Sequence, residues 1–146
     1  MVNVVQIAGK VKATVPMWRR TSTWVAVYSI VLALIAFWPQ PVDAGAGRFL
    51  RWLFDTVPLL TYERLEFGSN IVLFAPFGIG LALLMRELRY LIMPLALLSS
   101  LTIESVQAVL IAERTPSVLD IVANVSGACF GLVVVVSAEA LRARTR

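Results

Sequence analysis

Long apolar stretches constrain the fold of this chain more than any other feature of its sequence. Four of them, at residues 22–38, 68–85, 90–111 and 118–138, contain few strongly polar side chains. A helix needs about 17–25 such residues to cross a hydrocarbon core of about 30 Å. Helices also satisfy their backbone polar groups internally, as a bilayer requires. The stretches therefore predict an all-α polytopic membrane protein, with a four-helix transmembrane bundle.

The composition supports the same fold class. Of the 146 residues, 59% are apolar and 15% are charged, whereas a soluble domain is about 45–50% apolar and about 25% charged. This composition argues against a water-soluble globule and against a disordered chain. No internal repeat or low-complexity tract divides the sequence, so residues 1–146 are expected to form a single membrane domain.

The chain has no histidine, and its one cysteine is Cys129. Chemistry that needs an imidazole is therefore excluded, an intramolecular disulfide is impossible, and no cysteine cluster can hold zinc. Cys129 lies within an apolar run, where a small buried side chain is its ordinary role. The sequence predicts neither a cofactor nor a metal site.

Basic residues are concentrated on one side of the predicted bundle. That side holds Lys10, Lys12, Arg19, Arg20, Arg86, Arg89, Arg142, Arg144 and Arg146, and the other side holds Arg48, Arg51, Arg64 and Arg114. The richer side is expected in the cytoplasm, so four crossings place both the N- and the C-terminus there. The net charge of +4 is thus explained by topology, and no nucleic-acid partner is expected.

The first apolar stretch has an alternative interpretation as a cleaved signal peptide. Basic residues precede it, and Val42-Asp43-Ala44 is a candidate cleavage site. However, the apolar run exceeds the usual length of about 7–15 residues, and the segment before it is long. A membrane span is the preferred interpretation.

The loop at residues 39–67 contains an amphipathic segment. Arg48, Arg51 and Asp55 share one face of a helix, and apolar side chains cover most of the remaining surface. This pattern predicts a short interfacial helix in the headgroup region, ending before Pro58. A loop collapsed onto the bundle is the alternative.

Six polar residues map to the outer half of the predicted bundle: Asn70, Glu104, Gln107, Arg114, Asp120 and Asn124. At 1.5 Å per residue, Glu104 and Asn124 lie about 10 and 9 Å below the outer surface. A carboxylate at the centre of a spanning helix costs roughly 2.5–3.5 kcal/mol on insertion, so it usually has a partner or a function. The short turn at 112–117 makes the last two spans antiparallel neighbours. We therefore expect one outward-facing polar pocket, in which Arg114 reaches Glu104 or Asp120, with hydrogen bonding between helices as the alternative explanation.

Four further residues are expected to shape the backbone around this pocket. Phe74, Pro76 and Gly78 lie in the middle of the second span, where Pro76 removes a backbone hydrogen bond and predicts a kink. In the last span, Gly127 precedes Gly131 by one turn and allows a neighbouring backbone to approach closely.

Three motifs carry a family resemblance. The segment Asn70-Ile-Val-Leu-Phe74-Ala-Pro76-Phe-Gly78 resembles the N-x-x-x-F-x-P-x-G signature of VanZ-like membrane proteins. Thr102-Ile-Glu104-Ser-Val-Gln107 resembles the I-E-x-x-Q element of that family, and Arg114 to Gly127 resembles its R-x5-D-x3-N-x2-G element. Their order and spacing match across residues 68–131.

The resemblance implies a small multi-pass protein of the bacterial plasma membrane, in a family named for a member associated with low-level resistance to the glycopeptide teicoplanin. It carries over ten residues by motif: Asn70, Phe74, Pro76, Gly78, Glu104, Gln107, Arg114, Asp120, Asn124 and Gly127.

The preferred function is that of an envelope protein that binds or modifies an amphiphile at the outer leaflet, such as a lipoglycopeptide or a cell-wall lipid. The alternative is a membrane enzyme acting on a lipid headgroup or a polyprenyl phosphate, with Glu104 and Asp120 as acid and base and Arg114 holding the phosphate. It is less favoured because the sequence offers no activated nucleophile. A transporter is disfavoured by the small number of spans, unless an oligomer supplies a path. The expected partners are the lipid bilayer, the amphiphile and, in an oligomer, further copies of the chain.

Overall fold

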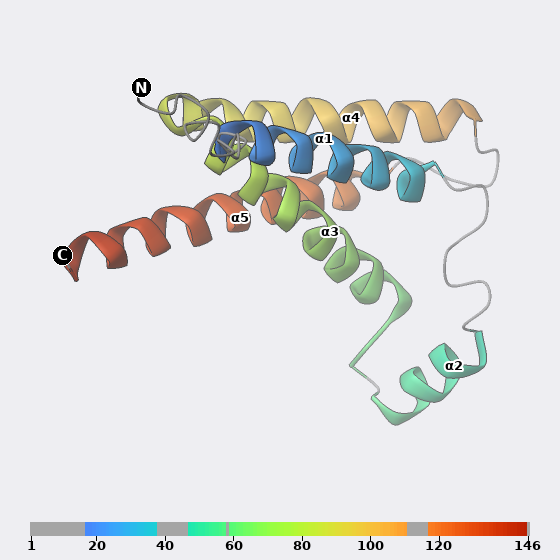
Figure 1. Ribbon diagram of the computed structural model, residues 1–146. Helices are drawn as coiled ribbons and strands as arrows, with labels where there is room; N and C mark the ends of the chain where they lie inside the picture. Colours follow the sequence, from blue (N-terminus) through green and yellow to red (C-terminus); the bar gives the residue numbers. More distant parts are fainter. Residues whose placement is uncertain (1–16, 38–46, 58, 111–116, 146) are drawn as a thin grey trace, which may run out of the picture.

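The computed structural model describes residues 17–37, 47–57, 59–110 and 117–145, and these residues contain helices and no strand. The prediction of an all-α protein is confirmed. The helices are α1 (Met17–Ala36), α2 (Gly47–Thr56), α3 (Tyr62–Leu84), the short 3-10 helix η3 (Arg86–Leu91), α4 (Ile92–Leu110) and α5 (Val118–Arg144). Figure 1 shows α1, α3, α4 and α5 packed along one another, with α2 set apart at one end.

Three helical stretches are long and apolar enough to cross a membrane: Tyr62–Leu84, Arg86–Leu110 and Val118–Arg144. The prediction of a fourth span at residues 22–38 is wrong for the part of the chain that the structure describes, because α1 is not among them.

The physical reason is the composition of α1. Its first two turns contain Arg19, Arg20 and three hydroxyl residues. The largely apolar remainder, residues 24–36, is only about 20 Å long at 1.5 Å per residue, which is short of a hydrocarbon core of about 30 Å. Trp38, the predicted outer end of this span, lies outside the described residues.

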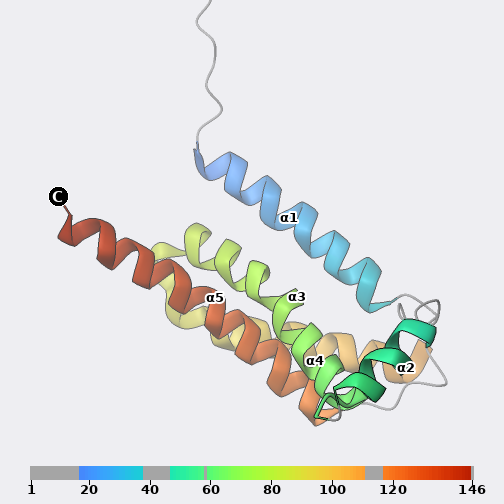
Figure 2. The ribbon, with the colours of Figure 1, turned by 90° about the horizontal axis from the view of Figure 1, so that it is seen from below.

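The closest packing in the bundle is between α3 and α5, which cross as Figure 2 shows. Glycines make this approach possible. A methyl group at Gly127 would overlap the backbone carbonyl of Ile71, and one at Gly78 would overlap the backbone of Ala128. Small residues allow helix backbones to come together in this way in a membrane. The crossing sets the first turns of α5 beside the first half of α3.

Helix α1 packs against α3 at two points. A Cβ atom at Gly80 would lie only 2.6 Å from Val25 Cγ2, so the two helices touch there. Farther along, the Tyr28 hydroxyl donates a hydrogen bond of 2.7 Å to the backbone carbonyl of Leu73. This bond is one residue away from the carbonyl of Val72, which loses its helical donor because Pro76 has no N–H. Helix α3 itself continues through Pro76 without interruption.

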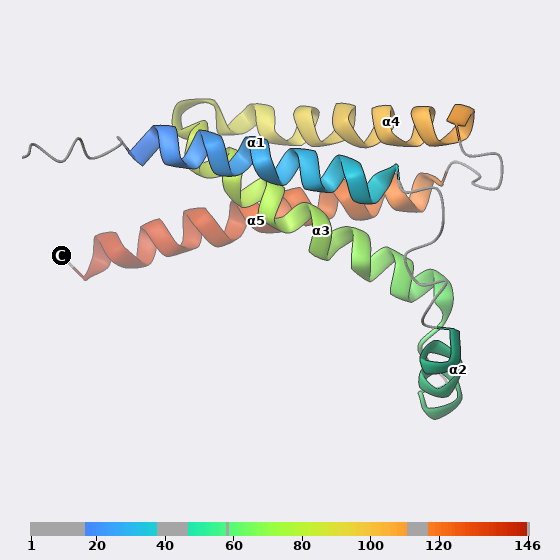
Figure 3. The same ribbon diagram turned by 45° about the vertical axis from the view of Figure 1, so that its right-hand side comes forward.

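Helix α2 confirms that the amphipathic segment is helical. None of its residues is buried. Phe49 and Trp52 contact each other with ring centroids 5.8 Å apart, and both remain more than half exposed. In Figures 1 and 3 the helix stands away from the bundle, which does not match a loop collapsed onto it. Its position at a membrane surface stays a prediction, and Pro58 lies outside the described residues.

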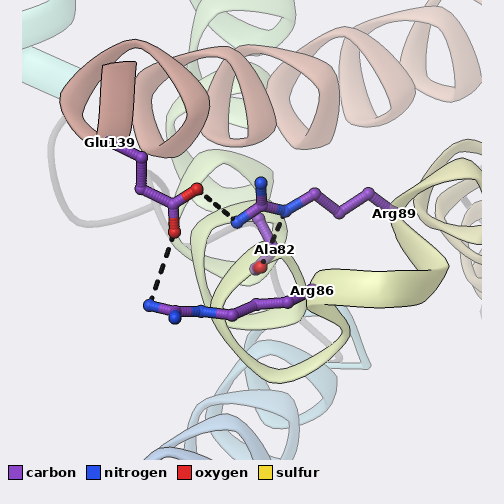
Figure 4. Close-up of polar contacts among 4 residues, drawn as sticks. All are labelled: Ala82, Arg86, Arg89 and Glu139. Carbon is purple, nitrogen blue, oxygen red and sulfur yellow. Dashed lines mark hydrogen bonds and ion pairs between the residues drawn. The ribbon is translucent and has the colours of Figure 1, made fainter. Parts of the chain in front are cut away.

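The start of α1, the turn at η3 and the end of α5 lie at the same end of the bundle (Figures 1 and 3), and each of them contains arginines. Figure 4 shows the polar contacts that join η3 to α5 there. Arg89 Nη2 lies 2.8 Å from Glu139 Oε2, and Arg89 Nε donates to the backbone carbonyl of Ala82 at 3.2 Å. Arg86 Nη2 lies 3.4 Å from the other oxygen of Glu139. The Glu139 carboxylate thus forms ion pairs with both arginines of η3, which connects α3 to α4.

Candidate functional site

A cavity of about 920 Å³ lies between α1, α3, α4 and α5, at the end of the bundle opposite the basic residues. Five of the six predicted pocket residues line it: Asn70, Glu104, Gln107, Asp120 and Asn124. Arg114, the sixth, falls outside the described residues. Side chains that are 54 positions apart in the chain, at Asn70 and Asn124, thus share one cavity.

The cavity also has an extensive apolar wall. Its side chains come from the last turns of α1 and from the first half of α3: Leu32, Ile35, Leu65, Val72, Leu73 and Phe74. The lining therefore combines polar side chains from α3, α4 and α5 with apolar side chains that come mainly from α1 and α3. A ligand with both a polar and an apolar part matches this mixed lining.

Glu104 is held by the start of α5. Its side chain is 6% exposed, and Oε2 accepts a hydrogen bond of 2.9 Å from the backbone N–H of Ser117. Ser117 is the N-cap of α5, where backbone N–H groups lack a partner within the helix. A carboxylate is favourable at this position because the N-terminus of a helix carries partial positive charge.

Asp120 lies in the first turn of the same helix. Its backbone N–H donates to Ser117 Oγ at 3.4 Å, as in an N-cap. The structure thus brings both predicted acids to the N-terminus of α5.

Asn124 follows Asp120 by one helical turn and is 4% exposed. Its Nδ2 donates to Ser100 Oγ at 2.9 Å, which links α5 to α4. Its Oδ1 is buried and accepts no hydrogen bond from any described residue. An unsatisfied buried acceptor costs about 1–3 kcal/mol, so a donor that enters the cavity and reaches this atom would gain that energy.

Gln107 serves as an anchor for α1. Its Nε2 donates a hydrogen bond of 2.7 Å to the backbone carbonyl of Ala36. Ala36 ends α1, and the last carbonyls of a helix have no partner within it. Asn70, in contrast, is half-buried on α3, and its amide makes no hydrogen bond with another described residue. Its side chain therefore keeps both donor and acceptor groups for the cavity.

The residues expected to shape the backbone all lie in or beside the contact between α3 and α5. Phe74 is 3% exposed, lines the cavity and meets Phe77 edge to face, with ring centroids 5.9 Å apart. Pro76 lies within α3, and Gly78 and Gly127 form the close crossing described above.

Four polar residues of the lining were not predicted from the sequence: Tyr62, Arg64, Glu66 and Ser69. The first three precede residue 68, the expected start of this span, whereas α3 begins at Tyr62. The signal was present at Thr61, whose side chain accepts from the Arg64 backbone N–H at 3.3 Å as an N-cap. The ion pairs of Glu139 were likewise not predicted from the sequence. The predicted topology already placed Glu139 at the same membrane face as Arg86 and Arg89.

A family model described as VanZ/LLP1 matches residues 25–139, a range that includes every residue lining the cavity. No curated protein and no solved structure matches the chain.

Proposed function

The chain belongs to the VanZ/LLP1 family, and from this premise we propose that it binds an amphiphile at the outer leaflet of the bacterial plasma membrane. Three helices long and apolar enough to span a bilayer make it a multi-pass membrane protein. The polar headgroup of the amphiphile would occupy the region around Glu104, Asp120 and Asn124. Its acyl chain would lie along the apolar side chains of α1 and α3.

The observation that carries this proposal is that polar and apolar side chains line the same cavity. Glu104 and Asn124 are buried polar side chains, and Leu32 and Phe74 are buried apolar ones, yet all four line the same space. Its volume of about 920 Å³ falls within the range of about 300–1,000 Å³ that is typical of ligand pockets. Polar side chains inside a membrane are costly and usually functional.

The proposed orientation follows from the distribution of basic residues. The described arginines at the end of the bundle formed by η3 and the end of α5 are Arg86, Arg89, Arg142 and Arg144. The positive-inside rule supports a cytoplasmic location for this end. The cavity, at the opposite end, would then lie in the outer half of the membrane.

Helix α2 is proposed to rest in the outer headgroup region. Arg48 and Arg51 are exposed on one side, and Phe49 and Trp52 are exposed on the rest of its surface. Apolar side chains on a helix with no protein neighbour are stabilised when they enter the acyl boundary. Leu60, shortly after this helix, lines the cavity, so α2 would lie near its entrance.

A link to teicoplanin belongs to the same proposal. Teicoplanin carries an acyl chain, so it is an amphiphile of the kind that the mixed polar and apolar lining would accept. Sequestering it, or binding the cell-wall lipid that it targets, would lower susceptibility to the antibiotic. This part of the proposal is supported by the family alone.

Native mass spectrometry of the full-length protein tests the proposal. The protein would be purified in detergent from bacterial membranes, as wild type and as the Asp120→Asn, Glu104→Gln and Glu139→Gln variants. We expect a co-purified amphiphile on the wild type and on Glu139→Gln, which changes a carboxylate at the other end of the bundle. The adduct should be reduced in the two cavity variants. An adduct equal in all four proteins, or absent from the wild type, would contradict the proposal.

A further inference from the structure

Three carboxamide side chains narrow the chemistry of the ligand. Asn70 on α3, Gln107 on α4 and Asn124 on α5 all line the cavity. We propose that they bind a neutral headgroup that carries several hydroxyl groups, as a sugar does. This inference rests on the proposed function, because it names the headgroup of the amphiphile proposed to bind there.

Asn70 has the most hydrogen-bonding capacity of the three. Its side chain is half-buried on α3, and its amide makes no hydrogen bond with another described residue. Two N–H donors and the Oδ1 acceptor are therefore left for a ligand. A polar side chain in a membrane-spanning helix is costly and usually functional. Because Asn70 contributes no such bond to the fold, ligand binding is the function that its position favours.

Gln107 and Asn124 are only partly used by the protein. One N–H of Gln107 Nε2 donates to the backbone carbonyl of Ala36, and one N–H of Asn124 Nδ2 donates to Ser100 Oγ. Each of these amides has a second N–H. Asn124, which is 4% exposed, also has a buried Oδ1 without a partner among the described residues. A buried acceptor without a donor is costly, so this oxygen favours a ligand that brings a donor.

A carboxamide both donates and accepts, and so does a hydroxyl group. The hydroxyl hydrogen rotates to suit the partner, and its oxygen accepts at the same time. Several hydroxyls on one ring can therefore serve amides that come from three different helices.

Other headgroups match the three amides less well. A phosphate monoester mainly accepts, so the amide oxygens would remain without a donor. A trimethylammonium group has neither a donor nor an acceptor. A primary amide has both, but it is a single group facing three side chains. The carboxamides thus favour a polyhydroxyl headgroup over each of these classes.

The test uses four probes with the same twelve-carbon chain length: dodecyl glucoside, dodecanamide, dodecyl phosphate and dodecyltrimethylammonium. Their binding to the full-length protein would be measured by native mass spectrometry over a concentration series, in a short-chain polyoxyethylene detergent that carries neither sugar nor charge. We expect dodecyl glucoside to bind about tenfold more tightly than each of the other three, which corresponds to about 1.4 kcal/mol.

Asn70→Leu links the preference to the carboxamides. The variant keeps a side chain of similar size and removes no hydrogen bond between described residues, so the protein should fold normally. Its affinity for dodecyl glucoside should fall about fivefold, as expected for the loss of one hydrogen bond, and its affinity for dodecyltrimethylammonium should not change. Thr102→Val is the matched control, because Thr102 does not line the cavity and its hydroxyl bonds to Leu98 within α4. It should leave all four affinities unchanged.

The outcomes separate this inference from the proposed function. If any other probe binds as tightly as dodecyl glucoside, the polyhydroxyl headgroup is overturned but amphiphile binding remains in place. An unchanged glucoside affinity in Asn70→Leu overturns the assignment to the carboxamides. The probe series on the wild type decides the headgroup without any variant. Failure of all four probes to bind overturns the proposed function as well.

Discussion

Glu104 Oε2 accepts a hydrogen bond of 2.9 Å from the backbone N–H of Ser117. This contact joins the second half of α4 to the N-cap of α5. The residues that connect the two helices, 111–116, lie outside the described part of the chain. The carboxylate therefore has a structural role beside the binding role proposed for it. Variants of Glu104 must be designed so that the two roles can be told apart.

Glu104→Leu should destabilise the protein, because Ser117 loses its acceptor. We expect a loss of about 1–3 kcal/mol in the free energy of unfolding, which is the usual cost of leaving a buried donor unsatisfied. Thermal unfolding in detergent would measure it. Glu104→Gln keeps an acceptor oxygen and should lose less. Equal stability of Glu104→Leu and the wild type would show that the contact contributes nothing.

Gly127→Ala should separate α3 from α5. The added methyl group would overlap the backbone carbonyl of Ile71, and overpacking of this kind costs about 1–3 kcal/mol. Ser126→Ala, at the exposed neighbouring position, is the control and should change stability little. The measurement is the unfolding temperature of both variants. A tolerated alanine at Gly127 would argue against the close crossing.

Gln107→Leu should loosen the end of α1. The variant removes the donor to the Ala36 carbonyl, a bond worth about 1 kcal/mol. Hydrogen exchange of the last turn of α1 should then accelerate about fivefold, if it proceeds through local opening. Thr102→Val is a suitable control on α4, since the Thr102 hydroxyl bonds only within its own helix, to Leu98. Unchanged exchange in Gln107→Leu would contradict the anchoring role.

At the basic end, Arg89→Leu should destabilise the protein more than Arg86→Gln. Arg89 bonds both Glu139 and the backbone carbonyl of Ala82 and is 23% exposed, whereas Arg86 meets Glu139 alone and is 61% exposed. Exposed ion pairs contribute about 0–1 kcal/mol. Thermal unfolding at low and high salt would rank the variants, and salt should weaken the effect of Arg86→Gln most. The opposite ranking would show that the Ala82 contact is unimportant.

The proposed orientation predicts the accessibility of single cysteines. In a Cys129→Ala background, Thr56→Cys at the end of α2 and Thr145→Cys after α5 would be treated with a membrane-impermeant maleimide in intact cells. We expect labelling at position 56 in intact cells and at position 145 only after lysis. The reverse pattern would place the cavity in the inner leaflet.

Hydropathy was a reliable guide to α3, α4 and α5 because burial in lipid requires apolar side chains over a whole span, whatever the neighbours are. Hydropathy failed for α1. The predicted span ran as far as Trp38, whereas the described helix ends at Ala36, and its first turn contains Arg19 and Arg20. The start of α3 was also placed too late. Helix ends depend on local caps such as Thr61, which a hydropathy window averages away.

The level of the polar residues could be derived from the sequence alone. Because a helix rises by a constant 1.5 Å per residue, counting from the short turn before α5 puts Glu104 and Asn124 at similar depths. Tertiary structure decided which atoms meet. These contacts depend on the rotation of each helix and on the glycine-mediated crossing of α3 and α5. In the resulting arrangement Glu104 accepts a hydrogen bond from Ser117, Asn124 donates one to Ser100, and Asn124 Oδ1 has no described partner. Those choices depend on packing between residues far apart in the chain, which no local pattern encodes.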